Sequence, residues 1–133
     1  MSNLEEELKS KGRIVYTNKG NSMSPLIKEG RDVLVIRAKN DGFRKNDVVL
    51  YKTPKGQLML HRIRKTSKGH YFIIGDHCTV GETVPQERVI GILESLMRGD
   101  RTVKLSGFSY KLYVVTIPLR RAAIRIRRKI SRK

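Results

Sequence analysis

A serine and a histidine far apart in the chain are the residues best suited to chemistry. Ser22 lies in the stretch "KGNSMSPLIKEG" (19–30), and His61 lies in the apolar run "LMLHRI" (58–63). A serine hydroxyl is a weak nucleophile unless a base accepts its proton, and neutral histidine is such a base near neutral pH. Asp76, in "IIGDH" (73–77), is an acid of the kind that orients a catalytic imidazole. If the fold joins these side chains, they predict acyl transfer through a serine.

The order of the motifs around these residues resembles that of the signal peptidase-like superfamily, which includes type I signal peptidases and SOS-type self-cleaving repressors. The shared pattern is Gly-x-Ser-Met-x-Pro, then Gly-Asp-x-Val-x-Val, then a strand with the base, then Gly-Asp. Here the corresponding segments are "GNSMSP" (20–25), "EGRDVLVI" (29–36), "HRI" (61–63) and "GD" (75–76). The resemblance covers roughly residues 13 to 97. It departs from the pattern at Arg31, which adds one residue to a loop.

The resemblance implies a β-rich catalytic domain and a serine endopeptidase that cuts an exported or secreted peptide precursor. Ser22 would be the nucleophile, with its backbone N–H as an oxyanion donor, and His61 would be the base, as in archaeal and endoplasmic reticulum relatives. Met23 would line the substrate pocket. Asp76 would orient the imidazole, although the same motif in lysine-type relatives leaves an architectural role open.

Two features of the site stay open at the level of sequence. Gly20 stands where bacterial signal peptidases often carry a hydroxyl, so the second oxyanion donor is unassigned, with Asn21 and Ser24 as candidates. Lys65 is an alternative base on the same predicted strand. The missing hydroxyl also supports a different class of function, a non-catalytic module that binds a peptide or an anionic surface.

Each residue also has an ordinary structural interpretation. Ser22 alone would be a turn residue, and His61 alone would be a half-buried strand residue. His77 beside Cys78 lacks further ligands at a recognisable spacing, so we expect no metal and no cofactor.

The elements that would position these residues are mainly short strands. β-Branched and apolar runs predict strands at 13–17, 32–38, 69–76 and 87–97, and a hairpin over 46–66 that turns at 54–56. Residues 67–69 and 81–86 are expected to be loops, and the acidic start "MSNLEEELKSKG" is expected to be helical. The prediction is a β-rich domain over 1–110.

The C-terminal tail, residues 111–133, has a different composition. It holds nine Lys or Arg residues and no acid, within a chain of net charge +17. From Pro118 onward, apolar residues at helical spacing predict a basic amphipathic helix, and the preceding "YKLYVVTI" (110–117) suits a membrane interface or a groove on the domain. The apolar positions of the helix are Leu119, Ala122, Ala123, Ile126 and Ile130.

Two partners for this tail follow from its composition. It could contact an anionic membrane through its arginines, or pack on its own domain through Leu119, Ala123 and Ile126. Nucleic acid is less favoured, because no recognised binding motif accompanies the charge. The arginines in question are Arg120, Arg121, Arg125, Arg127 and Arg128.

The expected location is the cytoplasm or the periphery of a membrane. No apolar run approaches the ~18 to 20 residues of a membrane span, and the acidic N-terminus is unlike a secretory signal. The single cysteine, Cys78, excludes an internal disulfide.

Overall fold

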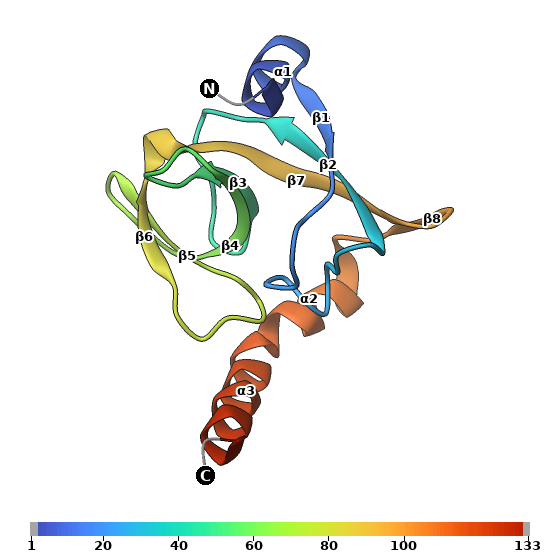
Figure 1. Ribbon diagram of the computed structural model, residues 1–133, viewed down its shortest axis with the longest axis vertical. Coiled ribbons are helices and arrows are strands. Elements are labelled where there is room, and N and C mark those ends of the chain that lie inside the picture. Colours follow the sequence, from blue (N-terminus) through green and yellow to red (C-terminus); the bar gives the residue numbers. More distant parts are fainter. Residues whose placement is uncertain (1–2, 132–133) are drawn as a thin grey trace.

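The computed structural model describes residues 3–131 and is mainly β, with a short N-terminal helix and two C-terminal helices (Figure 1). The β-rich character predicted from the sequence is therefore confirmed. In chain order the elements are α1 (Asn3–Lys11), β1 (Arg13–Tyr16), β2 (Asp32–Ala38), β3 (Val48–Lys52), β4 (Leu58–Ser67), β5 (His70–Ile74), β6 (Glu82–Pro85), the 3₁₀ helix η1 (Gln86–Arg88), β7 (Val89–Arg98), β8 (Arg101–Val103), α2 (Gly107–Val115) and α3 (Ile117–Ser131).

All the strands belong to one antiparallel sheet. Its order is β1-β2-β7-β3-β4-β5-β6, and β8 pairs with β7. The sheet curls, so that β3 to β6 face the half that carries β1 and β2, and α1 and the end of α3 lie at opposite ends of the molecule (Figure 1). Apolar clusters fill both faces: Leu8 of α1 belongs to one, and Ile63 of β4 belongs to the other. Central strands are thus buried on two sides, which explains their continuous apolar runs.

The hairpin of β3 and β4 positions His61. Its register pairs Val49 with His61 and Tyr51 with Met59, and the turn closes with a 2.8 Å hydrogen bond from the N–H of Thr53 to the carbonyl of Gln57. The hairpin predicted at this place is confirmed. His61, its neighbour Arg62 and Ile63 are all buried in β4. Since successive side chains of a strand point to opposite faces of the sheet, His61 and Arg62 lie on opposite faces.

The structure differs from the sequence prediction at residues 82–85. This segment, expected to be a loop, forms the edge strand β6, which pairs with β5 from Ile73 opposite Glu82 to His70 opposite Pro85. Pro85 lacks an N–H group, which an edge strand tolerates. A short strand with a proline has little signal of its own, and its pairing with β5 decides its conformation.

The C-terminal helices also differ in part from the prediction. The helix expected from Pro118 is present as α3, but α2 begins at Gly107 and crosses the boundary expected after residue 110. The alternative in which Leu119, Ala123 and Ile126 pack on the domain is wrong, because all three are exposed. Ile117 and Ile124, on the other side of α3, are buried instead. The helical period of the apolar residues predicted the apolar stripe, but the face that packs on the domain is set by contacts with the loop between β5 and β6.

Candidate active site

Ser22 and His61 meet in the fold. The Nε2 atom of His61 lies 3.1 Å from the Oγ atom of Ser22, across 39 residues of sequence. His61 comes from the middle of β4, and Ser22 lies in the turn-rich segment between β1 and β2. The distance is within the reach of a hydrogen bond between a nucleophile and its base.

The segment after β5 holds the backbone of Ser22 in place. The N–H of His77 donates a 2.8 Å hydrogen bond to the carbonyl of Ser22. Gly75 lies so close that a Cβ atom there would stand 2.6 Å from the same carbonyl oxygen and 3.1 Å from Cδ2 of His61. Only glycine fits this approach without displacing backbone, since real Cβ atoms do not come within 3.0 Å of other heavy atoms.

Tyr51 of β3 and Glu82 of β6 continue the hydrogen-bonded chain behind His61. The hydroxyl of Tyr51 donates to Oε1 of Glu82 over 2.6 Å and lies 3.0 Å from Nδ1 of His61. Because the hydroxyl of Tyr51 donates its proton to the carboxylate of Glu82, the oxygen of that hydroxyl can accept a hydrogen bond from Nδ1–H of His61. This arrangement assigns the proton of neutral His61 to Nδ1 and leaves the lone pair of Nε2 facing Ser22.

The environment favours the neutral form of this imidazole. Burial has the largest effect and lowers the pKa of His61 below its usual 6.5, while the nearby carboxylates of Glu82 and Asp76 oppose part of the shift. Burial, and after it the interaction with Glu82, raises the pKa of Tyr51. Tyr51 therefore keeps the proton that it donates to Glu82.

Asp76 lies in a different hydrogen-bonding cluster. It is 1% exposed, and its carboxylate accepts from Nε and Nη2 of Arg62 over 2.9 and 3.0 Å and from the hydroxyl of Tyr113 over 2.8 Å. Among residues 3–131 the atom facing Nδ1 of His61 is the Tyr51 oxygen, not an oxygen of Asp76. The negative charge of Asp76 acts on His61 over a longer distance and raises the pKa of the imidazole.

The other residues considered for the site are distributed around it. Met23 is fully buried in the core, and its sulfur accepts from the N–H of Asp76 over 3.4 Å. The side-chain oxygen of Asn21 accepts a hydrogen bond from the backbone N–H of Glu29. Lys65 is exposed. Ser24 donates its backbone N–H to the carbonyl of Asn21.

A cleft of about 700 Å³ opens beside the Ser22–His61 pair. One wall is segment 16–19, which starts at the last residue of β1, and the other is residues 56–61 of the hairpin. Pairing of β4 with β5 begins only at Arg62, so in the described residues the β4 edge over 58–61 is not covered by β5. The side-chain nitrogen of Asn18, in the first wall, is buried without a hydrogen-bond partner in the described part of the chain. This N–H group can donate to a carbonyl oxygen of an extended peptide after a small movement.

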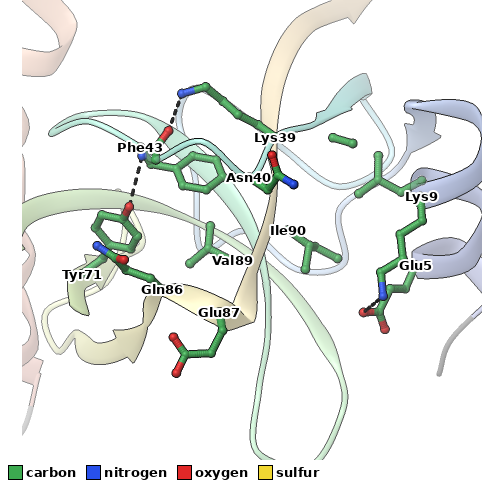
Figure 2. A pocket seen from close by; sticks show the side chains of 13 residues that line it. Glu5, Lys9, Lys39, Asn40, Phe43, Tyr71, Gln86, Glu87, Val89 and Ile90 are labelled. Carbon is green, nitrogen blue, oxygen red and sulfur yellow. Dashed lines mark hydrogen bonds and ion pairs between the residues drawn. The ribbon is translucent and has the colours of Figure 1, made fainter. Parts of the chain in front are cut away.

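A second pocket, of about 580 Å³, lies between α1 and the start of β7 (Figure 2). Figure 2 shows Phe43 and Tyr71 on one wall and Glu5 and Lys9 of α1 on the other, with the hydroxyl of Tyr71 accepting from the N–H of Phe43. Its lining contains no serine, cysteine or histidine. The pocket therefore lacks the groups for nucleophilic catalysis found in the cleft.

Across residues 3–131, no cluster of three or more His, Cys, Asp or Glu side chains is arranged to hold a metal ion, and no helix has the length and apolarity to cross a bilayer. No family model matches the chain, and no curated protein gives a significant sequence match.

Sequence reasoning missed Tyr51 and Glu82. The hairpin turn at 54–56 contained a usable signal for Tyr51, because the register that it sets places Tyr51 diagonally across from His61. No such signal exists for Glu82, since its segment is expected to be a loop and Tyr51 lies on β3, three strands away from β6 along the sheet.

Proposed function

We propose that this protein is a serine endopeptidase of the signal peptidase-like superfamily, with Ser22 as nucleophile and His61 as general base. The observation that carries the proposal is the 3.1 Å contact between Oγ of Ser22 and an Nε2 atom whose lone pair is free to accept. The substrate class is an exported or secreted peptide precursor, as the motif order implies.

The reaction begins when Nε2 of His61 takes the hydroxyl proton as Oγ of Ser22 attacks the scissile carbonyl carbon. The tetrahedral intermediate collapses as the C–N bond breaks, and His61 returns the proton to the leaving amine. Water, deprotonated by the same nitrogen, then attacks the ester and releases the acid and the free serine. The backbone N–H of Ser22 is the assigned oxyanion donor.

Tyr51 and Glu82 take the orienting role in this proposal, and Asp76 has an architectural one. During the attack His61 becomes an imidazolium, and Nδ1–H then donates more strongly to the tyrosine oxygen. The negative charge of Glu82, one hydrogen bond further on, stabilises that cation. Glu82 is exposed, so solvent screens its charge and its contribution is smaller than that of a buried acid.

The substrate would lie extended in the cleft between segment 16–19 and residues 56–61. The uncovered edge of β4 over 58–61 offers backbone groups to such a chain, a mode in which main-chain hydrogen bonds supply affinity. Asn18 is the donor best placed in the wall for a substrate carbonyl. Met23 supports the site from the core.

A fluorophosphonate tests this function directly, because an activated serine displaces fluoride and forms an Oγ–P bond. We expect one adduct by intact mass, mapped to Ser22 by peptide analysis, and none in Ser22→Ala. Ser67→Ala is the control, since Ser67 is exposed at the end of β4 and should leave labelling unchanged.

Absence of an adduct on the folded wild-type protein, under conditions that label a known serine peptidase, would contradict the proposal. That result would favour the non-catalytic module, which the glycine at position 20 and the lack of an assigned second oxyanion donor support. Equilibrium binding of extended peptides to the unlabelled protein would then be the next measurement.

A further inference from the structure

The two C-terminal helices expose a long apolar stripe. Their exposed apolar side chains follow one another at intervals of three, four or seven residues, the spacing that keeps side chains on one helical face. Helical hydrogen bonds run through the junction, from the N–H of Thr116 to Leu112 and from the N–H of Arg120 to Thr116. The stripe consists of Phe108 (82% exposed), Leu112 (53%), Val115 (72%), Leu119 (71%), Ile126 (60%) and Ile130 (67%).

The opposite side of these helices is the one that packs on the domain. Val114, Ile117 and Ile124 are buried there. Arg121, also buried, donates from Nε to the carbonyl of Cys78 over 2.8 Å and from Nη2 to that of Gly75 over 3.3 Å. Docking of the helix thus fixes the apolar stripe outward, and α3 extends away from the sheet toward the C-terminus (Figure 1).

Basic side chains border the stripe on both sides. At ~100° per residue, Arg127 lies ~80° to one side of Leu119, and Arg125 and Lys129 lie ~80–120° to the other. No acidic residue occurs between 111 and 133. Long basic side chains beside an apolar face can place their alkyl parts in lipid and their charges among anionic headgroups.

We propose that α2 and α3 form a docking surface for an anionic membrane, with the apolar stripe inserted at the level of the headgroups. A monomeric soluble protein rarely exposes this many large apolar side chains along one face. A second copy of the chain is a poor occupant, because each copy carries a net charge of +17 and would present basic borders to the other. Anionic lipid satisfies both the apolar stripe and the charge.

The surface differs from the one that composition alone indicated. Arg120 and Arg121 do not belong to it, since the guanidinium groups of both are hydrogen-bonded within the protein. Phe108, Leu112 and Val115 do belong to it, because α2 exposes them. The inference goes beyond the proposed peptidase activity and does not depend on it.

The test is co-sedimentation of the full chain with vesicles of phosphatidylcholine alone or with 30% phosphatidylglycerol, at about 0.1 M salt. We expect binding to the anionic vesicles only, weakened by added salt. Leu119→Ser/Ile126→Ser should weaken it at least ~10-fold, because the variant loses two aliphatic side chains that would insert into the lipid. Val33→Ser, at an exposed apolar position of β2, is the matched control and should bind like the wild type.

The charge component has its own pair of variants. Lys111→Gln/Lys129→Gln should reduce binding ~10-fold or more, whereas Lys55→Gln/Lys68→Gln removes the same charge from exposed turns of the sheet and should have less effect. All four positions are exposed, so we expect each variant to fold, and circular dichroism would check this.

Equal sedimentation with neutral and anionic vesicles, or undiminished binding of Leu119→Ser/Ile126→Ser, would overturn the proposal. So would a dimer by analytical ultracentrifugation that this double variant dissociates, because the stripe would then be covered by a second copy.

Discussion

His61 and Arg62 are neighbours in β4, yet they belong to two polar clusters of different character. His61 joins Ser22, Tyr51 and Glu82 in a chain that begins at a cleft and ends at an exposed carboxylate. Arg62 is fully buried. It pairs with Asp76 and also donates to the carbonyl of Asn46 and the hydroxyl of Tyr110, over 2.8 Å each.

The two clusters have different roles, since the Arg62 cluster stabilises the fold and the His61 chain has a group available for proton transfer. In the Arg62 cluster the guanidinium and the carboxylate are both satisfied by groups from distant parts of the chain, so no polar group is left to react. In the His61 chain the imidazole keeps a lone pair directed at a hydroxyl beside the cleft. A buried ion pair therefore secures one face of β4, while the other face stays available for proton transfer.

The largest expected effect is on the reactivity of Ser22. His61→Ala should slow fluorophosphonate incorporation ~10²- to 10⁴-fold, because the hydroxyl loses its base. His70→Ala is the matched control, since His70 is exposed on β5 and should react as the wild type does. Both rates are measured by intact mass over time. Equal rates for the two variants would remove His61 from the mechanism.

The Arg62 cluster should instead affect stability. Arg62→Met leaves the buried carboxylate of Asp76 without its cation, which we expect to lower the free energy of unfolding by about 3–5 kcal/mol in urea titrations. The double variant Arg62→Met/Asp76→Leu should recover part of this loss, because no charge then remains unpaired. A variant Arg62→Met with wild-type stability would show that the two clusters do not differ in this way.

Intermediate effects are expected behind the imidazole. Tyr51→Phe removes the acceptor of Nδ1–H, and we expect Ser22 labelling to slow about 10-fold, the equivalent of ~1.4 kcal/mol. Glu82→Gln keeps a hydrogen-bond acceptor but removes the charge, so a smaller reduction should follow. Glu87→Gln, also exposed, is the control. A wild-type rate in Tyr51→Phe would return the orienting role to Asp76 or to solvent.

The smallest effect concerns pH. Burial lowers the pKa of His61, so the neutral base persists below pH 6.5, and the labelling rate should fall only as the pH drops through that lowered pKa. Glu82 opposes the shift, so Glu82→Gln should lower the pKa further and move the acid limb to lower pH. Rates measured between about pH 4.5 and 8 test both statements. Movement to higher pH in Glu82→Gln would contradict the assigned contact.

The sequence determined much of the β body and the two principal site residues. Strand-forming runs and the turn residues between them predict the β3–β4 hairpin, since these signals are local and the observed pairing agrees with them. Ser22 and His61 could be selected because motif order marks residue types in sequence without requiring their distance. The amphipathic period of α3 was equally local.

Tertiary structure decided which groups each side chain meets. Glu82 reaches Tyr51 only because β6 pairs with β5 at the edge of the sheet. The outward face of α3 was likewise set by Arg121 and Ile124 packing on the domain. Such contacts join residues tens of positions apart, and local periodicity carries no information about which distant partner lies within hydrogen-bonding distance.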